Sequence, residues 1–284
     1  MTAPRSFGWL PEAPGQHDEI VGGPNRDASN DLLVGAAPAP SEFLRLVPAL
    51  PAFKDQDVTK TCVPHAITNV AEASLKAISG KAVDPSSIFE LYGTANALIE
   101  PPGAPLQDVG TYARVVMHVA KEWGVARDRD WPFRNPKTGR VDLARATTRV
   151  PPDVLQRASA WKLDEQLTIY ATGPDRLRTV DAALASLSGV PAAGVVDGAF
   201  LGYQGRGVLG APNLNDARGR HMVAIVGYRT NKPAKKREYL IRNSWRSWGL
   251  VFQGQPSMAW VSEEWVHAQE ELYRLRVSRG RRTS

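Results

Sequence analysis

The chain contains a single cysteine, Cys62, and other residues of the sequence are of the types that a thiol nucleophile needs. Gln56 lies six residues before Cys62, His221 begins one apolar, strand-like run, and Asn243 follows a second such run. A thiol attacks a carbonyl carbon as the thiolate, a histidine accepts and returns the proton, and an asparagine can hold the imidazole ring in place. The order Gln, Cys, His, Asn therefore indicates acyl transfer through a cysteine.

Each of these residues also has an ordinary structural interpretation. A lone cysteine is often a small buried apolar side chain, and a single histidine or asparagine commonly has a structural role. His65 lies three residues after Cys62 on the same predicted helix, a spacing that can hold a metal. Because the chain has one cysteine and five histidines, we expect His65 to be structural, and we expect neither a metal nor a cofactor.

The helices predicted in the first half of the chain give Cys62 a favourable position. Apolar residues recur at helical spacing from Cys62 to Ile78, and Gly80 ends this helix. In the first turn of a helix, unpaired N–H groups and the helix dipole stabilise a negatively charged sulfur. Two more helical patterns follow, one after the start signal at 84–87 and one over 111–123.

The second half of the chain is mainly strand-like. Its four strand patterns lie at 190–196, 222–228, 238–242 and 258–261. A hairpin of the second and third strands would bring His221 and Asn243 together at one end of a sheet. A helical half followed by a β half predicts an α+β protein of two lobes with a cleft between them.

The same residues supply donors for the negatively charged oxygen that forms during acyl transfer. One candidate donor is the backbone N–H of Cys62, and the other is the side-chain amide of Gln56. Trp245 is expected in a supporting role, covering the hydrogen bond between His221 and Asn243 so that water does not compete for it.

Three motifs in this order resemble the papain-like cysteine peptidase family. They are Gln56 with five residues to Cys62, Gly-x-His-x-Val-x-x-Val-Gly-Tyr around His221, and Asn-Ser-Trp-x-x-Trp-Gly from Asn243. The resemblance implies a papain-like fold with a helical left lobe, an antiparallel, β-barrel-like right lobe and the active site in the cleft. The start of the chain around Trp9 is similar to that of bacterial and phage members.

The resemblance also implies where a peptide would bind. The acyl side of the peptide would run along Val109 and Gly110 through backbone hydrogen bonds. The S2 pocket would be lined by Thr111, Tyr112, Val195, Gly219 and Met222. Because these residues are mostly apolar, we expect a preference for an apolar P2 side chain.

The sequence differs from the family pattern around the nucleophile. Thr59-Lys60-Thr61-Cys62-Val63 stands where the family usually has Cys-Gly-Ser-Cys-Trp, so the disulfide of the left lobe is absent. Lys60 takes the place of a glycine beside the S1 site. His221 and Asn243 lie 159 and 181 residues after Cys62 (221 − 62 and 243 − 62), beyond the usual spacing of about 130–150, which implies insertions.

Three regions are expected along the chain. Residues 1–40 are an irregular N-terminal extension, 41–145 a mainly helical lobe that carries the cysteine, and 146–284 a mainly β lobe that carries the histidine and asparagine. The extension has two interpretations: it packs against the folded body, or it lies across the cleft as a short inhibitory segment similar to a pro-segment. The apolar residues near its start favour packing.

Composition narrows the class of protein further. The 284 residues are 43% hydrophobic, enough to bury a large core. There is no run of 18 apolar residues, and the start lacks the apolar stretch of a signal peptide, so we expect a cytoplasmic protein or leaderless export, without a membrane partner.

The net charge of +6 owes much to five arginines between Arg274 and Arg282. No nucleic-acid motif accompanies them, so we interpret this stretch as a solvated, partly disordered end and expect no nucleic-acid partner. The sequence predicts a monomer that acts on polypeptides, a cysteine endopeptidase working through a thioacyl-enzyme on Cys62. Two alternatives stay open, namely a catalytically silent peptide-binding protein and a transpeptidase or transamidase with the same site.

Overall fold

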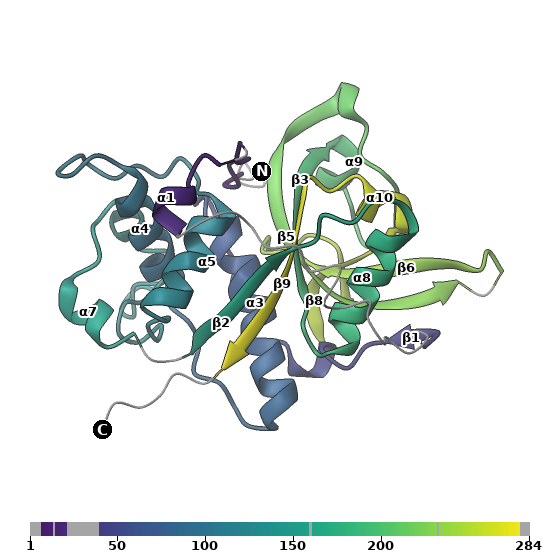
Figure 1. Ribbon diagram of the computed structural model, residues 1–284, viewed down its shortest axis with the longest axis horizontal. Coiled ribbons are helices and arrows are strands. Elements are labelled where there is room, and N and C mark those ends of the chain that lie inside the picture. The colour runs from purple at the N-terminus through teal and green to yellow at the C-terminus, as the bar shows by residue number, and fades with distance from the viewer. Residues whose placement is uncertain (1–6, 14, 22–39, 159–160, 232, 279–284) are drawn as a thin grey trace.

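Helices dominate the first half of the chain (Figure 1). The structure is a computed structural model, which describes residues 7–13, 15–21, 40–158, 161–231 and 233–278. The first elements are α1 (Asp18–Val21), β1 (Glu42–Phe43) and the short 3-10 helix η1 (Val47–Ala49). The helices that follow are α3 (Cys62–Ser79), α4 (Ile88–Ile99), α5 (Ala113–Glu122), α6 (Leu143–Ala146) and α7 (Pro152–Gln156).

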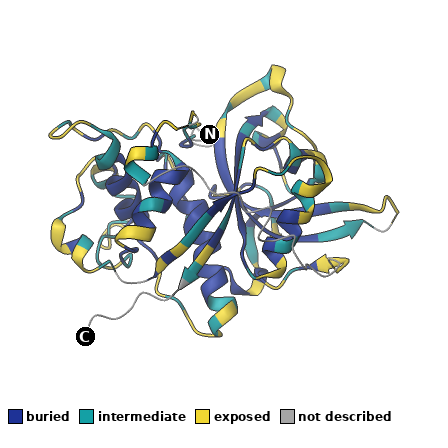
Figure 2. Ribbon diagram, viewed as in Figure 1, coloured by how far each residue is buried: buried dark blue, intermediate teal, exposed yellow. Residues whose placement is uncertain are grey.

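The helix predicted from Cys62 is α3, and it is the central helix of the molecule. It ends where the sequence indicated, because Gly80 adopts the left-handed conformation that a helix C-cap favours. Every residue from Cys62 to Leu75 is buried. A helix buried on all sides is enclosed by other elements rather than lying on the surface. Figure 2 shows this continuous burial through the middle of the molecule.

The second half forms one mixed sheet with short helices around it. Its strands are β2 (Lys162–Thr168), β3 (Val190–Asp197), β4 (Val208–Leu209), β5 (Ala217–Asn231), β6 (Lys236–Arg242), β7 (Leu250–Phe252), β8 (Gln255–Ser262) and β9 (Glu271–Ser278). Its helices are α8 (Gly173–Ala185), α9 (Gly198–Leu201), the 3-10 helix η2 (Leu214–Asp216) and α10 (Glu263–His267). The strand order is β2-β9-β3-β5-β6-β8-β4, with β1 added on β5 and β7 on β8.

The predicted α+β fold is confirmed, and the sheet predicted to be barrel-like is not closed into a barrel. The sheet is open, because among the described residues β2 and β4 are end strands that do not pair with each other. In Figure 1, β2 and β9 run diagonally from the sheet toward α5 and α3. The fold is therefore mixed α+β with an open, largely antiparallel sheet.

The expectation of a solvated, partly disordered C-terminal end holds only in part for its first arginines, because both lie in an ordered strand although Arg276 is exposed. Arg274 and Arg276 lie in β9, which pairs with β2, and Arg276 forms an ion pair of 3.6 Å with Glu165. Residues 279–284, which hold the other three arginines, lie outside the described residues, as do 1–6, 14 and 22–39 of the N-terminal extension.

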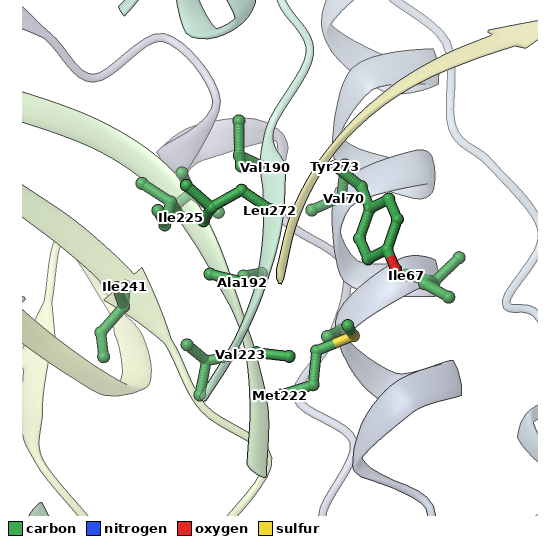
Figure 3. Packing of buried hydrophobic residues seen from close by; sticks show 14 of the residues in the cluster. Ile67, Val70, Val190, Ala192, Met222, Val223, Ile225, Ile241, Leu272 and Tyr273 are labelled. Atoms are coloured by element: carbon green, nitrogen blue, oxygen red, sulfur yellow. The ribbon is translucent and has the colours of Figure 1, made fainter. Parts of the chain in front are cut away.

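The core between α3 and the sheet fixes where the two halves meet. Ile67 and Val70 of α3 belong to one buried apolar cluster with residues of the sheet, and Met222 of β5 points toward α3 (Figure 3). Complete burial of such a side chain stabilises the fold by about 1.5–3 kcal/mol. This packing directs the first turn of α3 toward β5. Within the residues that the structure describes, no helix combines the length and the apolar character that a membrane crossing requires.

Candidate active site

Cys62 lies in the first turn of α3, and its side chain has no exposed surface. Burial raises the pKa of the Cys62 thiol to about 12, although backbone hydrogen bonds from Met222, Gly8, Val63 and Cys62 itself lower it. The effect of the helix N-terminus that the sequence predicted is therefore outweighed by desolvation. In this arrangement the thiol is protonated at neutral pH.

His221 and Asn243 lie side by side, on adjacent strands of the sheet. His221 is on β5, Asn243 follows β6, and the imidazole Nε2 is 2.7 Å from the Asn243 Oδ1. Because an amide oxygen only accepts, Nε2 donates, which leaves Nδ1 as the basic nitrogen of the neutral ring. Met222, the next residue on β5, hydrogen-bonds through its backbone to the Cys62 thiol, so this strand passes within hydrogen-bonding distance of the sulfur.

Aromatic rings enclose the His221–Asn243 hydrogen bond. The indole of Trp245 stacks on the imidazole with ring centroids 4.2 Å apart and planes 25° apart. Phe200 meets both rings edge-on, at 6.3 Å from His221 and 5.8 Å from Trp245. His221 is 2% exposed and Asn243 is 1% exposed. A hydrogen bond in such low-dielectric surroundings is stronger than one in water.

Gln56 is fully buried, and both ends of its amide are held. Its Nε2 donates to the Thr59 carbonyl at 2.9 Å, and its Oε1 accepts from the Ser244 hydroxyl at 2.5 Å. The backbone N–H of Gln56 also donates to the Ser244 carbonyl at 2.9 Å. Ser244 thus links the Gln56 loop to the Asn243 segment. The sequence analysis gave Ser244 no role, although its position next to Asn243 was a signal.

Asp108 links the loop before Cys62 to the segment at Gly110, and the sequence analysis gave it no role either. The Asp108 carboxylate accepts the backbone N–H of Lys60 at 3.0 Å and the Tyr92 hydroxyl at 2.7 Å. The Tyr92 oxygen in turn accepts the backbone N–H of Gly110 at 3.0 Å. This chain of hydrogen bonds fixes the two sides of the space in front of Cys62.

That space is filled by the start of the chain. We call residues 7–13 and 15–21 the cover segment. Its backbone pairs with Thr111 in parallel, with the Thr111 N–H donating to the Gly8 carbonyl at 2.8 Å and the Leu10 N–H to the Thr111 carbonyl at 3.1 Å. The backbone of Gly8 also hydrogen-bonds to Cys62. The cover segment therefore lies directly on the sulfur.

Five of the seven residues predicted to bind substrate lie against the cover segment or Cys62. Thr111 pairs with it, and a Cβ on Gly110 would come within 2.6 Å of the Gly8 carbonyl oxygen. A Cβ on Gly219 would come within 2.7 Å of the Phe7 ring. The Tyr112 hydroxyl accepts from the Gln16 side chain at 3.2 Å. The fifth, Met222, reaches Cys62 as described above.

The other two residues predicted to bind substrate lie elsewhere. Val109 is 45% exposed. Val195 lines a separate small cavity of about 50 Å³ beside Phe200 and Trp265. The structure thus brings together the glycine edge at Gly110 and the β5 side of the predicted pocket, but not Val195.

Buried charges attach the cover segment to the body. Arg114, whose side chain is 5% exposed, pairs with Glu12 at 3.0 Å and with Asp18 at 2.9 Å. His17 lies 3.3 Å from the same Glu12 carboxylate. Removing one partner of such a buried pair leaves an uncompensated charge and is strongly destabilising. The sequence analysis missed this cluster, because residues about a hundred positions apart carry it.

His65 has the surroundings of a structural residue. Its Nδ1 lies 2.7 Å from the Thr61 carbonyl, and its ring packs edge-on against Phe133 at 5.1 Å. Burial lowers the pKa of His65 to about 3, so the ring is neutral at physiological pH. Among the residues that the structure describes, no group of three or more His, Cys, Asp or Glu side chains could hold a metal ion.

Residues 108–258 match the sequence model of the papain family cysteine protease. The chain belongs to this family. The matched region includes His221 and Asn243 and begins 46 residues after Cys62 (108 − 62). This papain-like cysteine protease carries the family's fold, in agreement with the resemblance found in its sequence.

Solved structures of similar fold include three cysteine proteases. Xylellain from Xylella fastidiosa aligns with a TM-score of 0.70 at 18% identity, over 97% of this chain and 98% of that chain. The bromelain protease from Ananas comosus in complex with the E64 inhibitor aligns at 0.60 and 17%, over 83% and 98%. ProCathepsin B S9 from Trypanosoma congolense aligns at 0.63 and 13%, over 97% and 86%. No curated protein sequence matches the chain significantly.

Proposed function

We propose that this papain-family protease is a cysteine endopeptidase with Cys62 as nucleophile and His221 as general base and acid. One observation carries the proposal. His221 forms a hydrogen bond of 2.7 Å with Asn243, and the next residue on the same strand, Met222, hydrogen-bonds through its backbone to the Cys62 thiol. With Nε2 engaged by Asn243, the other nitrogen of the ring is the one available to exchange a proton with the sulfur.

The reaction follows from these positions. His221 takes the proton of Cys62, and the sulfur attacks the peptide carbonyl carbon. The negative oxygen accepts hydrogen bonds from the Cys62 N–H and from the Gln56 amide, whose orientation Ser244 fixes. The C–N bond then breaks as His221 returns the proton to the leaving amine. Water, deprotonated by His221, attacks the thioester carbonyl, the C–S bond breaks, and the acid leaves as Cys62 regains its proton from His221.

We also propose that the described arrangement is a latent form of the enzyme. The cover segment lies on the sulfur, the thiol is buried, and its pKa is far above neutrality. The helical lobe (41–145) and the β lobe (146–284) act as the two walls of the cleft. Of the two interpretations of the N-terminal extension, occlusion of the cleft is supported by the Gly8 contact with Cys62.

The test displaces the cover segment from Cys62 without deleting it. A Cβ on Gly8 would lie 1.8 Å from the Lys60 carbonyl oxygen, so Gly8→Val should displace the segment. We expect Gly8→Val to cleave an unfolded protein such as casein at least tenfold faster than wild type. Cys62→Ala or His221→Ala in the same background should abolish cleavage. An inactive Gly8→Val protein that still binds peptide would instead support a silent binding protein. Ligated peptide products formed with an added amine would support a transpeptidase.

A further inference from the structure

Two adjoining cavities in the helical half of the chain form a groove lined by charged side chains. The cavities have volumes of about 390 and 500 Å³, and Pro85 and Asp128 belong to the walls of both. We call the two cavities together the basic groove. Its uncharged wall residues are prolines, alanines, a leucine and a valine. Its cations are Lys54, Lys76, Arg127, Arg129 and Arg134, and its carboxylates are Glu72, Asp84 and Asp128.

Each carboxylate of the basic groove already has a partner. Glu72 accepts a hydrogen bond from Lys54 Nζ at 2.8 Å, and Asp84 pairs with Arg127 at 3.0 Å. Asp128 accepts a backbone N–H at 3.0 Å. Two of the five cations are therefore neutralised by carboxylates of the groove itself.

The other three cations form no ion pair within the described residues. Arg134 donates to two backbone carbonyl oxygens, at 3.2 and 3.1 Å, and Lys76 donates to one at 3.3 Å. Arg129 is exposed, and its side chain makes neither a hydrogen bond nor an ion pair in the part of the chain that the structure describes. The groove therefore presents positive charge that no carboxylate of the protein balances.

A further positive charge lies buried behind the wall of the groove. Arg242 is 1% exposed, and its Nη1 donates to the carbonyl of the wall residue Pro51 at 2.9 Å. Its Nε and Nη2 are buried and form no hydrogen bond, and its guanidinium lies 5.7 Å from the centre of the Phe53 ring. The carboxylate that acts on its charge is Glu72, which Lys54 already engages. Because one buried carboxylate faces two cations, this wall keeps a net positive charge, which attracts anions strongly away from bulk water.

We propose that the basic groove is a docking site for an acidic segment of the polypeptide substrate, separate from the stretch that is cut in the cleft. The inference rests on the proposed peptidase function. Glutamate and aspartate side chains of the segment pair with Lys76, Arg129 and Arg134, and its uncharged residues contact the prolines and alanines of the wall.

The basic groove adjoins two residues of the candidate active site. Arg134 donates to the carbonyl of Asp55, which directly precedes Gln56. Arg242, behind the other part of the groove, directly precedes Asn243. A substrate held in the groove therefore stays close to the cleft, which raises the local concentration of its cleavable stretch.

The residues of the wall favour a polypeptide over a nucleic acid. Among the described residues that line the two cavities none is aromatic, whereas proteins that bind single strands stack the bases on aromatic rings. Asp84 and Asp128 would repel a continuous row of phosphates, but a peptide can place neutral residues opposite them. We therefore expect the groove to bind carboxylates that are spaced along a chain.

The experiment measures binding to the full chain with Cys62→Ala, which prevents cleavage. Calorimetry at low ionic strength compares a blocked octapeptide of alternating glutamate and alanine with the same peptide carrying glutamine. We expect the glutamate peptide to bind at least tenfold more tightly, and the pair Lys76→Gln and Arg129→Gln to raise its dissociation constant at least fivefold. The control pair Arg45→Gln and Lys235→Gln removes the same charge from exposed residues outside the groove and should change the constant less than twofold.

Three results would overturn the inference. The first is equal binding of the two peptides, and the second is an equal loss of binding in the groove pair and the control pair. The third is a heparin fragment or DNA oligonucleotide of equal charge that binds more tightly than the peptide and loses its binding in the groove pair, because the groove would then serve another polyanion.

A second measurement connects the basic groove to turnover. In the Gly8→Val enzyme, a substrate peptide extended by the glutamate octapeptide should have a KM at least fivefold lower than the peptide without the extension, at the same kcat. The pair Lys76→Gln and Arg129→Gln should remove this difference. Binding of the glutamate peptide to a protein that cuts nothing would refute only the proposed function. An active enzyme whose KM does not respond to the extension would refute only the docking role of the groove.

Discussion

The α-carbon of Gly8 packs against the carbonyl oxygen of Lys60 so closely that a Cβ on Gly8 would lie 1.8 Å from that oxygen. Lys60 lies two residues before Cys62, and its own N–H is held by Asp108 at 3.0 Å. The Lys60 backbone therefore cannot move aside easily, and only glycine allows the cover segment to reach the sulfur. This contact makes the occlusion of Cys62 depend on one residue.

The reactivity of Cys62 should report on this contact. Burial raises the pKa of the covered thiol to about 12, so the thiolate content of wild type should keep rising with pH throughout the accessible range. We expect iodoacetamide to label wild type slowly at pH 7 and faster up to pH 10 without a plateau. Gly8→Val should label at least 100-fold faster at pH 7. The rates are measured by mass spectrometry of the intact protein.

The control for this measurement is Gly210→Val, because a Cβ on Gly210 meets nothing within 4 Å. It should label at the wild-type rate. Rapid labelling of wild type at pH 6–7 would show that the segment does not protect the sulfur.

Arg114 should determine how firmly the cover segment is attached. Arg114→Met removes the partner of both Glu12 and Asp18, and leaves the buried Glu12 carboxylate without its guanidinium. Losing one partner of a buried pair costs about 3–5 kcal/mol, so the segment should detach and Cys62 labelling at pH 7 should rise about 100-fold or more. Arg157→Met removes an exposed pair with Asp153 and should change nothing. Similar rates for both variants would contradict the anchoring role.

Local sequence patterns were sufficient to predict the helices and strands that carry the site. They were not sufficient to predict which elements pair across the fold. The apolar spacing after Cys62 predicted α3, and two neighbouring strand patterns predicted that His221 and Asn243 would meet. In contrast, the openness of the sheet depends on which strands pair across the fold, and no short window of sequence encodes that. The contact between Trp9 and Glu271 joins residues 262 positions apart.

Some features were missed although their signal was present. In β9, Tyr273 and Leu275 alternate with Arg274 and Arg276, which is the period of a half-buried strand. The positive charge of this stretch favoured a solvated end, whereas the alternation of apolar and charged residues indicates a strand. The protonated state of Cys62 is different, because it follows from the complete burial of the sulfur and needs the three-dimensional structure.

Glu90 should make the stability of the fold depend on pH. This residue of α4 has no exposed surface, and burial raises its pKa to about 8. Between pH 4.5 and 8 the folded state holds a proton that the unfolded state has released, so wild type should lose stability as the pH rises. Glu90→Gln removes this dependence. We expect its free energy of unfolding to gain about 1–4 kcal/mol relative to wild type from pH 5 to pH 8.

Denaturant unfolding at several pH values measures this difference. Glu264→Gln, an exposed carboxylate paired with Lys236, is the control and should differ from wild type by less than about 0.5 kcal/mol throughout. A difference between Glu90→Gln and wild type that stays constant with pH would show that Glu90 titrates normally.

Ser244 should act on catalysis through Gln56 and not through Cys62. Its hydroxyl donates to the Gln56 Oε1 at 2.5 Å, and this bond sets the direction of the amide that is proposed to stabilise the negative oxygen. Removing a donor of this kind lowers kcat by about 10²–10³-fold, which is our expectation for Gln56→Ala in the Gly8→Val background. Ser244→Ala keeps the Gln56 amide but removes the hydrogen bond that orients it, so kcat should fall about tenfold with little change in KM.

Iodoacetamide labelling of Cys62 forms no tetrahedral intermediate and should proceed at the rate of Gly8→Val. A parallel loss of labelling would show instead that Ser244 supports the His221–Asn243 pair, to which its backbone N–H is also joined, 2.7 Å from Asn243 Oδ1.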